Sequence, residues 1–392
     1  MAASVRSRVI VASRIYEPEG GAAAYRLAAL VRALERDGHE VTVLTTRPPS
    51  GERSTPAVRR WPVLRDRSGA VRGYLPYASF DVPLFFRILF GPRADVMVVE
   101  PPPTTGVAAR VACALRRRPY VYFSADVTTV AARGIGVNRF ALRLIALLER
   151  TALRGAARVL AVSPAVRDEV VALGAPASKV VDVGTGIDTS AFDAEGPIPP
   201  SDAPYFVYGG TMSEIQGASV FVDAFALLAD RRPDVRLLMF GDGVERPDLA
   251  RRAEAAGHGR IEFHGSVPAT ELAPWLRGAV AALASVRPRS GYDFAFATKA
   301  LVGLACGVPV VYSGAGPLAP LISANRLGWA VDWDAEAVAA AMEEALDLEP
   351  RPAERKRRRA WVEETYSLDA VGARAARVVA DAAAGELTGS AD

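Results

Sequence analysis

A lysine near the start of a predicted helix is the residue whose position most strongly suggests chemistry. Only three of the 47 basic residues are lysines, Lys179, Lys299 and Lys356, and Lys299 precedes a helix predicted over 300–306. Thr298 is a suitable residue to cap that helix. A cation in a first helical turn is unfavourable unless an anion also lies there. Lys299 therefore indicates an anion site, and the alternative is a solvated surface lysine.

Three glycine-containing turns follow predicted strands. They are 17–21 (Glu-Pro-Glu-Gly-Gly), 209–217 (Gly-Gly-Thr-Met-Ser-Glu-Ile-Gln-Gly) and 240–243 (Phe-Gly-Asp-Gly). Glycine lets the backbone approach a ligand closely, and free amides at a helix start attract anions. In the second turn, Thr211 and Ser213 add hydroxyl donors. Ordinary strand–helix turns explain the glycines of 17–21 equally well, whereas two glycine turns at one edge of a sheet favour a ligand site.

Asp126 lies just after a strand predicted over 120–123. A carboxylate at this place can orient a hydroxyl group or take its proton. No Asp-x-Asp pair lies beside the glycine turns, and the cysteines and histidines lack metal-ligand spacing. We therefore expect no metal and no cofactor, and we expect Cys113 and Cys306 to be reduced core residues.

Elements that can position these groups alternate along most of the chain. Short, uniformly apolar strands separated by helices are typical of parallel sheets covered on both faces, a doubly wound α/β fold. The predicted strands are 8–12, 41–44, 96–99, 120–123, 159–162, 205–208, 235–240, 261–263, 279–283 and 308–312. The predicted helices include 21–36, 218–230, 300–306 and two within 353–384, divided at Tyr366-Ser367.

The alternation pauses at 193–204, which contains four prolines and predicts a linker. We expect a Rossmann-like domain over 1–192, a second over 205–365, and a C-terminal helix at 366–392 that returns to the first domain. Two such domains facing each other place a cleft between the carboxyl ends of both sheets, the usual ligand site of this architecture.

Composition excludes several classes of protein. Half of the 392 residues are hydrophobic and 23% are charged, which excludes a disordered chain. The net charge of +3 (47 − 44), with arginine spread throughout, gives no nucleic-acid footprint. Residues 1–11 lack the apolar run of a signal peptide, and no stretch reaches the ~20 residues of a membrane span. We expect a cytoplasmic protein.

Two local patterns allow more than one interpretation. The apolar run 83–90 is too short for a membrane span; it fits a core helix, and also an acceptor-site or membrane-skimming loop. The basic run 355–359 suggests a phospholipid or nucleic-acid contact, but a solvated helix face is the simpler interpretation. We therefore expect membrane contact to be peripheral at most.

The motifs together resemble the two-domain GT-B glycosyltransferases, specifically the retaining group called family four, over nearly the whole chain. The motifs in order are Gly20-Gly21, 37–43, Glu100-Pro-Pro-Pro103, Asp126, 161–163, Gly186-Ile-Asp188, Tyr208-Gly-Gly210, Gln216-Gly217, 241–243, 263–265, Thr298-Lys299 and 305–310. No single motif is specific, but their number and order are. Gln216-Gly217 and Thr298-Lys299 are similar to the subgroup that builds bacterial surface polysaccharides with amino- or deoxy-sugars.

The chain departs from the family at the donor diphosphate. Most of the wider family has an Arg at the position of Thr211 and a Lys at that of Gln216. These departures leave Lys299 as the best remaining cation for the leaving group, with Arg246 as a second candidate.

Two further family features are missing. A pair of glutamates eight residues apart corresponds here to about Phe294 and Val302. The histidine usual near the end of the strand at 120–123 is replaced by Ser124-Ala125-Asp126.

The resemblance implies transfer of a sugar from a nucleoside diphosphate to a small-molecule or glycan acceptor, with retained configuration and no covalent enzyme intermediate. It implies that the second domain binds the donor, that the first binds the acceptor, and that Asp126 and Lys299 are catalytic. The donor-binding residues implied are Gly21, Gly210, Thr211, Ser213, Gln216, Gly241, Asp242, Gly243, Arg246, Phe294, Ala295, Phe296 and Thr298. The acceptor-binding residues implied are Gly20, Tyr16 and Ser124.

Two alternatives remain open at this point. The missing glutamates, histidine and Arg/Lys pair also fit a degenerate, non-catalytic binder. The same fold also serves enzymes that couple the sugar to nitrogen or sulfur.

Overall fold

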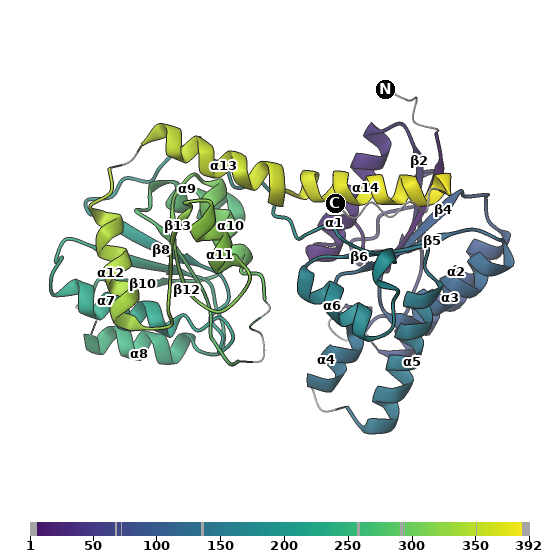
Figure 1. Cartoon of the computed structure of the whole chain (residues 1–392), viewed down its shortest axis with the longest axis horizontal. Helices are drawn as coiled ribbons and strands as arrows, with labels where there is room; N and C mark the ends of the chain where they lie inside the picture. Colours follow the sequence, from purple (N-terminus) through teal and green to yellow (C-terminus); the bar gives the residue numbers. More distant parts are fainter. Residues whose placement is uncertain are drawn as a thin grey trace. The chain divides into compact units, whose positions relative to one another are not determined.

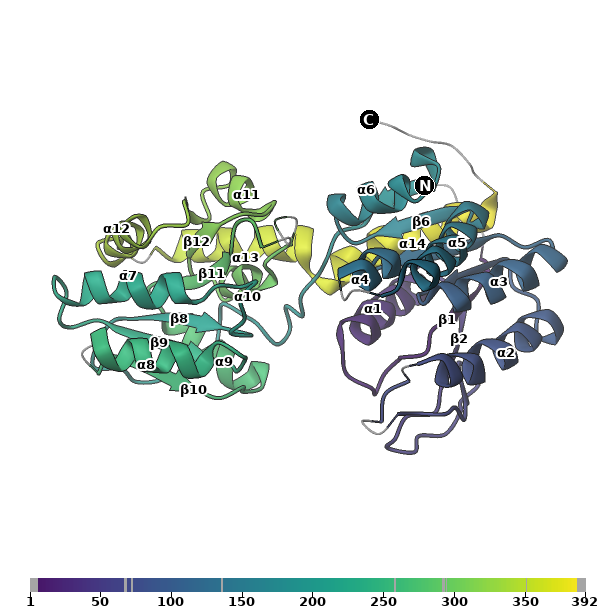
Figure 2. The same ribbon diagram turned by 90° about the horizontal axis from the view of Figure 1, so that it is seen from below.

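The structure is a computed structural model that describes residues 6–66, 69–71, 73–134, 137–256, 259–290, 293, 295–349 and 351–385. It comprises two compact α/β units (Figures 1 and 2). The first contains Met1–Thr185 and Leu368–Asp392, and the second contains Gly186–Ser367. Each has a parallel sheet with helices on both faces, so the predicted doubly wound α/β class is confirmed.

The first unit is built on a seven-stranded parallel sheet with the order β3-β2-β1-β4-β5-β6-β7. Its strands are β1 (Arg8–Ala12), β2 (Glu40–Thr46), β3 (Val58–Trp61), β4 (Val96–Val99), β5 (Tyr120–Ser124), β6 (Arg158–Ala161) and β7 (Val180–Asp182). Its α-helices are α1 (Ala22–Arg36), α2 (Tyr74–Phe90), α3 (Pro103–Leu115), α4 (Thr128–Gly134), α5 (Arg139–Gly155), α6 (Pro164–Ala172) and α14 (Leu368–Ala384).

Alternate residues of each strand feed two separate cores in this unit. Val9 and Val11 of β1 pack with α1 and α14 on one face, whereas Ile10 and Ala12 pack with α2, α3 and α5 on the other. This alternation is the reason that strands such as β4 (VMVV) are apolar at every position.

The second unit is built on a six-stranded parallel sheet with the order β10-β9-β8-β11-β12-β13. Its strands are β8 (Tyr205–Gly209), β9 (Arg236–Phe240), β10 (Ile261–His264), β11 (Ala282–Val286), β12 (Val310–Gly314) and β13 (Gly328–Val331). Its α-helices are α7 (Ser219–Ala229), α8 (Arg246–Ala256), α9 (Ala269–Gly278), α10 (Thr298–Ala305), α11 (Leu318–Ala324), α12 (Ala335–Leu346) and α13 (Pro352–Tyr366). α7 and α12 pack on one face of the sheet, and α9, α10 and α13 on the other.

In both units the strand order reverses beside the first strand, between β1 and β4 and between β8 and β11. Loops that leave the carboxyl ends of such neighbouring strands diverge and leave room for a ligand. Both candidate sites described below lie at these places.

The proline-rich segment 193–204 lies inside the second unit and does not link the two units. Arg359 of α13 lies 2.8 Å from the carboxylate of Asp193, and Arg277 of α9 donates to the carbonyls of Asp193 and Pro197. These contacts hold the segment on its own unit. The division falls at 185–186 and 367–368 instead.

The last helix of the chain packs against the first. α14 lies along α1 in the first unit (Figure 1), and Gly372 contacts the backbone of Ala29 so closely that a Cβ at 372 would lie 2.6 Å from the Ala29 carbonyl oxygen. A missing side chain at Gly372 therefore sets the distance between the two helices.

We expect Gly372→Ala to lower the free energy of unfolding by about 1–3 kcal/mol, because the new methyl group overpacks the α1–α14 contact. In a free helix the same change is stabilising by roughly 1 kcal/mol. Arg377→Ala, at an exposed position of α14, is the matched control and should change stability by less than about 0.5 kcal/mol. Urea denaturation followed by circular dichroism decides the sign, and a stabilised Gly372→Ala protein would contradict the packing argument.

Candidate active site

A cavity of about 340 Å³ lies at the carboxyl ends of β8 and β9 in the second unit. Six of the predicted donor-binding and catalytic residues line it: Gly210, Thr211, Gly241, Asp242, Thr298 and Lys299. The structure thus brings both glycine turns and the conspicuous lysine to one place, although about 90 residues separate the first turn from Lys299 in sequence.

The two glycine turns pack backbone against backbone. The amide of Gly210 donates to the Phe240 carbonyl at 2.8 Å, and the amide of Met212 donates to the Asp242 carbonyl at 2.9 Å. Gly241 and Gly243 have φ angles of 130° and 155°, and a Cβ on either would overlap a carbonyl oxygen of the opposite turn. Glycine at these two positions is therefore required for the contact between turns, and not only for the approach of a ligand.

Gly210 has a different reason to lack a side chain. Its φ is 144°, and a Cβ there would overlap the Cε of Lys299. The lysine stem thus occupies the space that any other residue at 210 would fill. Gly210 and Lys299 form one packing unit at the cavity wall.

Lys299 lies near the start of α10, as predicted, but the helix begins two residues earlier than the predicted range 300–306, and Thr298 does not cap it. α10 begins at Thr298 itself, the residue before it is Ala297, and no side chain bonds to the free amides of this end. Thr298 is exposed and lines the cavity. Two amides of this turn bond to the backbone instead: those of Thr298 and Ala300 donate to the carbonyls of Phe296 and Ala297 at 2.9 and 3.0 Å.

Lys299 is partly buried, and its ammonium has a neutral partner. Its Nζ donates to Oε1 of Gln216 at 2.5 Å and lies 5.7 Å from the centre of the Tyr208 ring. Within the described ranges, no carboxylate lies within 4 Å of this ammonium group. Burial lowers the pKa of Lys299 to about 8.

Gln216 is held in place from the backbone side. The Ser285 hydroxyl donates to its carbonyl at 2.6 Å. Gln216 does not line the cavity; it contacts the site only through the hydrogen bond that its side chain accepts from Lys299, among the described residues.

Other predicted donor-binding residues lie outside the cavity wall: Ser213, Gln216, Gly243, Arg246, Ala295 and Phe296. Phe296 packs against Tyr366, with ring centres 5.2 Å apart. Arg246 begins α8, and its Nε has no hydrogen-bond partner in the described part of the chain. Phe294 lies outside the described residues.

Five residues of the cavity wall were not predicted from the sequence: Phe192, Ser266, Val267, Leu272 and Val302. Val302 stands about where the family resemblance places a glutamate. It lies three residues after Lys299 on α10, and that helical spacing was the signal that could have found it.

A second, smaller cavity of about 180 Å³ lies at the carboxyl ends of β1, β4 and β5 in the first unit. It is lined by Ser13, Arg14, Ile15, Ala23, Arg26, Glu100, Pro101, Ala125 and Asp126. Asp126 is exposed, and the start of α4 just after it is capped by Glu149, whose carboxylate accepts from the amides of Thr128 and Thr129. Asp126 is therefore not the cap of that helix.

The floor of this cavity holds a compensated ion pair. Arg26 lies 2.8 Å from the carboxylate of Glu100, and the Ser13 hydroxyl donates to the same carboxylate at 3.2 Å. Burial raises the pKa of Glu100, and the Arg26 guanidinium opposes the rise. Arg14 donates to the backbone carbonyls of Val71 and Pro101.

The remaining predicted residues of the first unit do not line this cavity. Gly21 precedes α1 with a φ of 135°, and both Gly20 and Gly21 are exposed. Tyr16 is buried, which raises its pKa to about 12. Ser124 is fully buried, and its hydroxyl donates to the Asp126 carbonyl at 3.2 Å, so it positions the Asp126 backbone.

The described residues show neither a metal-binding cluster nor a membrane-spanning helix. They contain no group of three or more His, Cys, Asp or Glu side chains arranged to hold a metal ion. None of the helices in these ranges combines the length and the apolar character needed to cross a membrane.

Comparisons with known proteins match both units of the chain to glycosyltransferase domains. Residues 20–186 match the family described as "Glycosyl transferase 4-like domain", and residues 203–347 match "Glycosyl transferases group 1". The HepE protein of Anabaena, solved with UDP, superposes with a TM-score of 0.66 at 16% identity, over 96% of this chain and all of that one.

Curated relatives match over shorter stretches. A D-inositol 3-phosphate glycosyltransferase of Paenarthrobacter aurescens is 33% identical over 47% of each chain. A GDP-mannose-dependent alpha-(1-6)-phosphatidylinositol dimannoside mannosyltransferase of Mycobacterium tuberculosis is 35% identical over 39% of this chain and 37% of its own length. The chain thus spans less than half the length of these relatives. With both domain families matched in order, the chain belongs to the glycosyltransferases that join a glycosyl transferase 4-like domain to a group 1 domain.

Proposed function

We propose that this glycosyltransferase moves a sugar from a nucleoside diphosphate to an acceptor hydroxyl, with retained configuration and without a metal ion. The observation that carries the proposal is the partly buried ammonium of Lys299, without a carboxylate partner among the described residues, at the wall of the cavity in the second unit. A buried charge is costly unless it is paired. A diphosphate in the cavity supplies the missing negative charge.

The cavity offers a diphosphate two kinds of partner. The first is the Lys299 ammonium, and the second is the positive end of the α10 helix dipole, because Thr298 and Lys299 of its first turn line the cavity. In this transfer, the bond from the anomeric carbon to the diphosphate oxygen breaks and the bond to the acceptor oxygen forms on the same face. The acceptor proton passes to the leaving oxygen. Negative charge grows on the diphosphate, and these fixed partners stabilise it more strongly as it grows.

Asp126 is proposed to orient the acceptor. Its carboxylate is exposed at the cavity in the first unit, and the helix that follows is capped by Glu149. A carboxylate without a structural task at the carboxyl end of a strand is a good candidate for binding a substrate hydroxyl.

The names of related proteins support a nucleotide-sugar donor but do not identify it here. HepE was solved with UDP, and the mycobacterial relative is named as dependent on GDP-mannose. A thermal-shift screen with UDP, GDP and dTDP identifies the nucleobase, since a ligand that binds the native state raises the midpoint. Turnover of the matching nucleotide sugar then separates an enzyme from a degenerate binder, and turnover in the presence of a chelator tests independence from metal ions. Product analysis separates transfer to oxygen from transfer to nitrogen or sulfur.

The surroundings of both cysteines fit the proposed cytoplasmic location. Cys113 and Cys306 are buried and unpaired, and burial raises the pKa of each thiol to about 12. Each thiol therefore stays protonated and unreactive as part of a core.

We expect Lys299→Met to weaken binding of the preferred nucleoside diphosphate by about 10- to 150-fold, the range of a charge-assisted hydrogen bond worth about 1.5–3 kcal/mol. Binding of the bare nucleoside should hardly change, because it lacks the anion. Calorimetric titration of both ligands into both proteins makes the comparison. Equal losses for the two ligands would show that Lys299 acts through structure and not through the diphosphate.

Diphosphate affinity should also depend on pH in one direction. The pKa of Lys299 is about 8 in the free protein, and an anion raises it. Below pH 8 the ammonium is charged in both states, whereas above it binding must recover a proton, so affinity falls by about tenfold or more between pH 7 and 9.5. Lys299→Arg, which stays charged, should show no such fall. A wild-type affinity that is flat over this interval would contradict the assignment.

Asp126→Asn should leave diphosphate binding within a few-fold while turnover drops by about 10²-fold, the scale of a lost acid–base or orienting group. The fold should be unaffected because the helix cap is Glu149. Steady-state kinetics with the identified donor provide the test. Wild-type turnover in this variant would remove Asp126 from the mechanism.

A further inference from the structure

Helix α2 has two apolar faces, of which the unit buries one. Phe80, Leu84 and Ile88 are buried in the core, while Val82, Phe86 and Phe90 are exposed by 56%, 51% and 78%. The exposed residues are spaced by four, so they form one stripe along the helix. The sequence 83–90 is therefore both a core helix and an exposed apolar surface, which joins two of the interpretations considered above.

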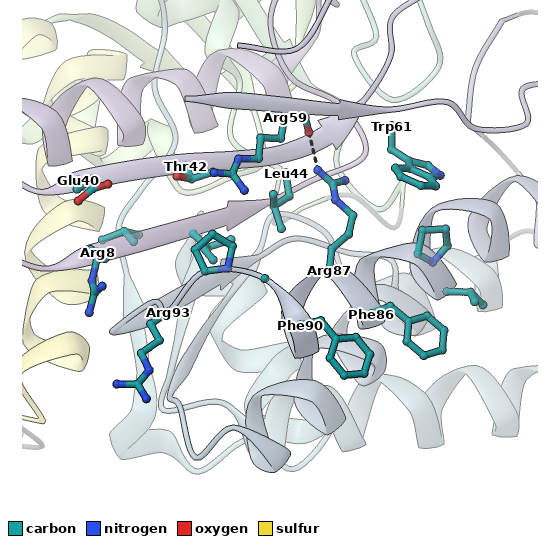
Figure 3. A pocket seen from close by; sticks show the side chains of 16 residues that line it. Arg8, Glu40, Thr42, Leu44, Arg59, Trp61, Phe86, Arg87, Phe90 and Arg93 are labelled. Carbon is teal, nitrogen blue, oxygen red and sulfur yellow. Dashed lines mark hydrogen bonds between the residues drawn. The ribbon is translucent and has the colours of Figure 1, made fainter. Parts of the chain in front are cut away.

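The stripe borders a cavity of about 730 Å³ between α2 and strands β1 to β3 (Figure 3). Phe86 and Phe90 stack with ring centres 6.2 Å apart, and Trp61 of β3 lies across the cavity, 41% exposed. Ile10 and Leu44 of the sheet form apolar lining. Monomeric proteins rarely leave aromatic groups together in water without a partner for them.

Positive charge gathers on the same wall. Arg8, Arg59, Arg87 and Arg93 line the cavity with one carboxylate, Glu40, so the wall has a net charge of 4 − 1 = +3. Among the described residues, Arg59, Arg87 and Arg93 form no ion pair, and Arg8 lies 3.8 Å from Asp95. Because the whole chain also has a net charge of only +3, this wall is a local excess.

Two of these guanidinium groups are close enough to affect each other. Arg87 donates to the Arg59 carbonyl at 2.9 Å, and burial together with the Arg59 guanidinium lowers the pKa of Arg87. Arg59 and Arg87 are neighbouring cations next to apolar groups and have no ion pair among the described residues. An amphiphile with a negative head group is complementary to such a surface.

We propose that α2, β3 and the cavity between them form a docking surface for a bilayer rich in anionic phospholipid. Phe86, Phe90 and Trp61 enter the interface, and the four arginines bind lipid phosphates. α2 has 17 residues and is shorter than the ~20 of a membrane span, so it lies in the interface plane. The proposal rests on this surface and does not depend on the proposed sugar transfer.

The test is sedimentation with vesicles of phosphatidylcholine alone and of phosphatidylcholine with phosphatidylglycerol. The wild-type protein should bind only the second kind and should be released by high salt, because salt screens the contacts of exposed charges. Failure of the wild type to bind phosphatidylglycerol vesicles overturns the proposal.

Two double variants locate the surface. Arg59→Ala with Arg93→Ala should lower the partition coefficient about 25-fold, at about fivefold for each arginine. Phe86→Ser with Phe90→Ser should lower it at least about tenfold. Phe86 and Phe90 are at least half exposed, and Arg59 and Arg93 are exposed and form no ion pair with the described residues. Both double variants should therefore fold, and an unchanged melting midpoint verifies it.

Phe140→Ser is the matched control, an aromatic residue of α5 that is 81% exposed but lies outside the cavity wall. It should bind vesicles like the wild type, and an equal loss in this control would overturn the assignment to this face. Sedimentation velocity without lipid tests the other occupant. A wild-type dimer that Phe86→Ser with Phe90→Ser converts to a monomer would show that the face binds a second copy, and would also overturn the proposal.

Discussion

The partly buried ammonium of Lys299, with a glutamine and no carboxylate as its described partner, is the constraint on which the rest of the second unit's site depends. Its stem occupies the space left by the missing side chain of Gly210. Gly210 in turn belongs to a turn that packs backbone to backbone against Gly241 and Gly243. A larger residue at any of these three positions would separate the turns or displace the lysine. The glycines therefore maintain the position of a charge that has no carboxylate partner among the described residues.

The two candidate sites treat charge in opposite ways. In the first unit, Arg26 and Glu100 neutralise each other inside the cavity, which suits a polar acceptor held by hydrogen bonds. In the second unit no carboxylate of the described residues pairs with the cation, which suits a diphosphate. The wall of α2 and β3 shows a third arrangement, in which arginines with one ion pair among the described residues, Arg8 with Asp95, lie beside exposed aromatic groups. There the proposed partner is a surface and not a small molecule.

Sequence patterns predicted ten of the thirteen described strands and the glycine turns, because both depend on local features, whereas the edge strands β3, β7 and β13 were not predicted. Uniformly apolar runs such as 96–99 became central strands, and the split at Tyr366-Ser367 separates α13 from α14. The proline content of 193–204 predicted a linker, because proline content is a local feature of the sequence. The Arg359–Asp193 contact that holds the segment on the second unit joins residues far apart in sequence, so local patterns do not indicate it. Val302 was missed for a related reason: an apolar residue that lines a cavity has the same pattern as one in a core. Whether Thr298 caps α10 depended on where the helix begins, which residue type alone does not determine.

The most direct test uses the scarcity of lysine in this chain. With ¹³C-labelled lysine, only Lys179, Lys299 and Lys356 give side-chain signals. Titration of the free protein should show Lys299 with a pKa of about 8, and saturation with nucleoside diphosphate should raise that pKa while the other two signals serve as internal controls. A Lys299 titration that is unchanged by a bound diphosphate would contradict the account, because the anion would then lie elsewhere.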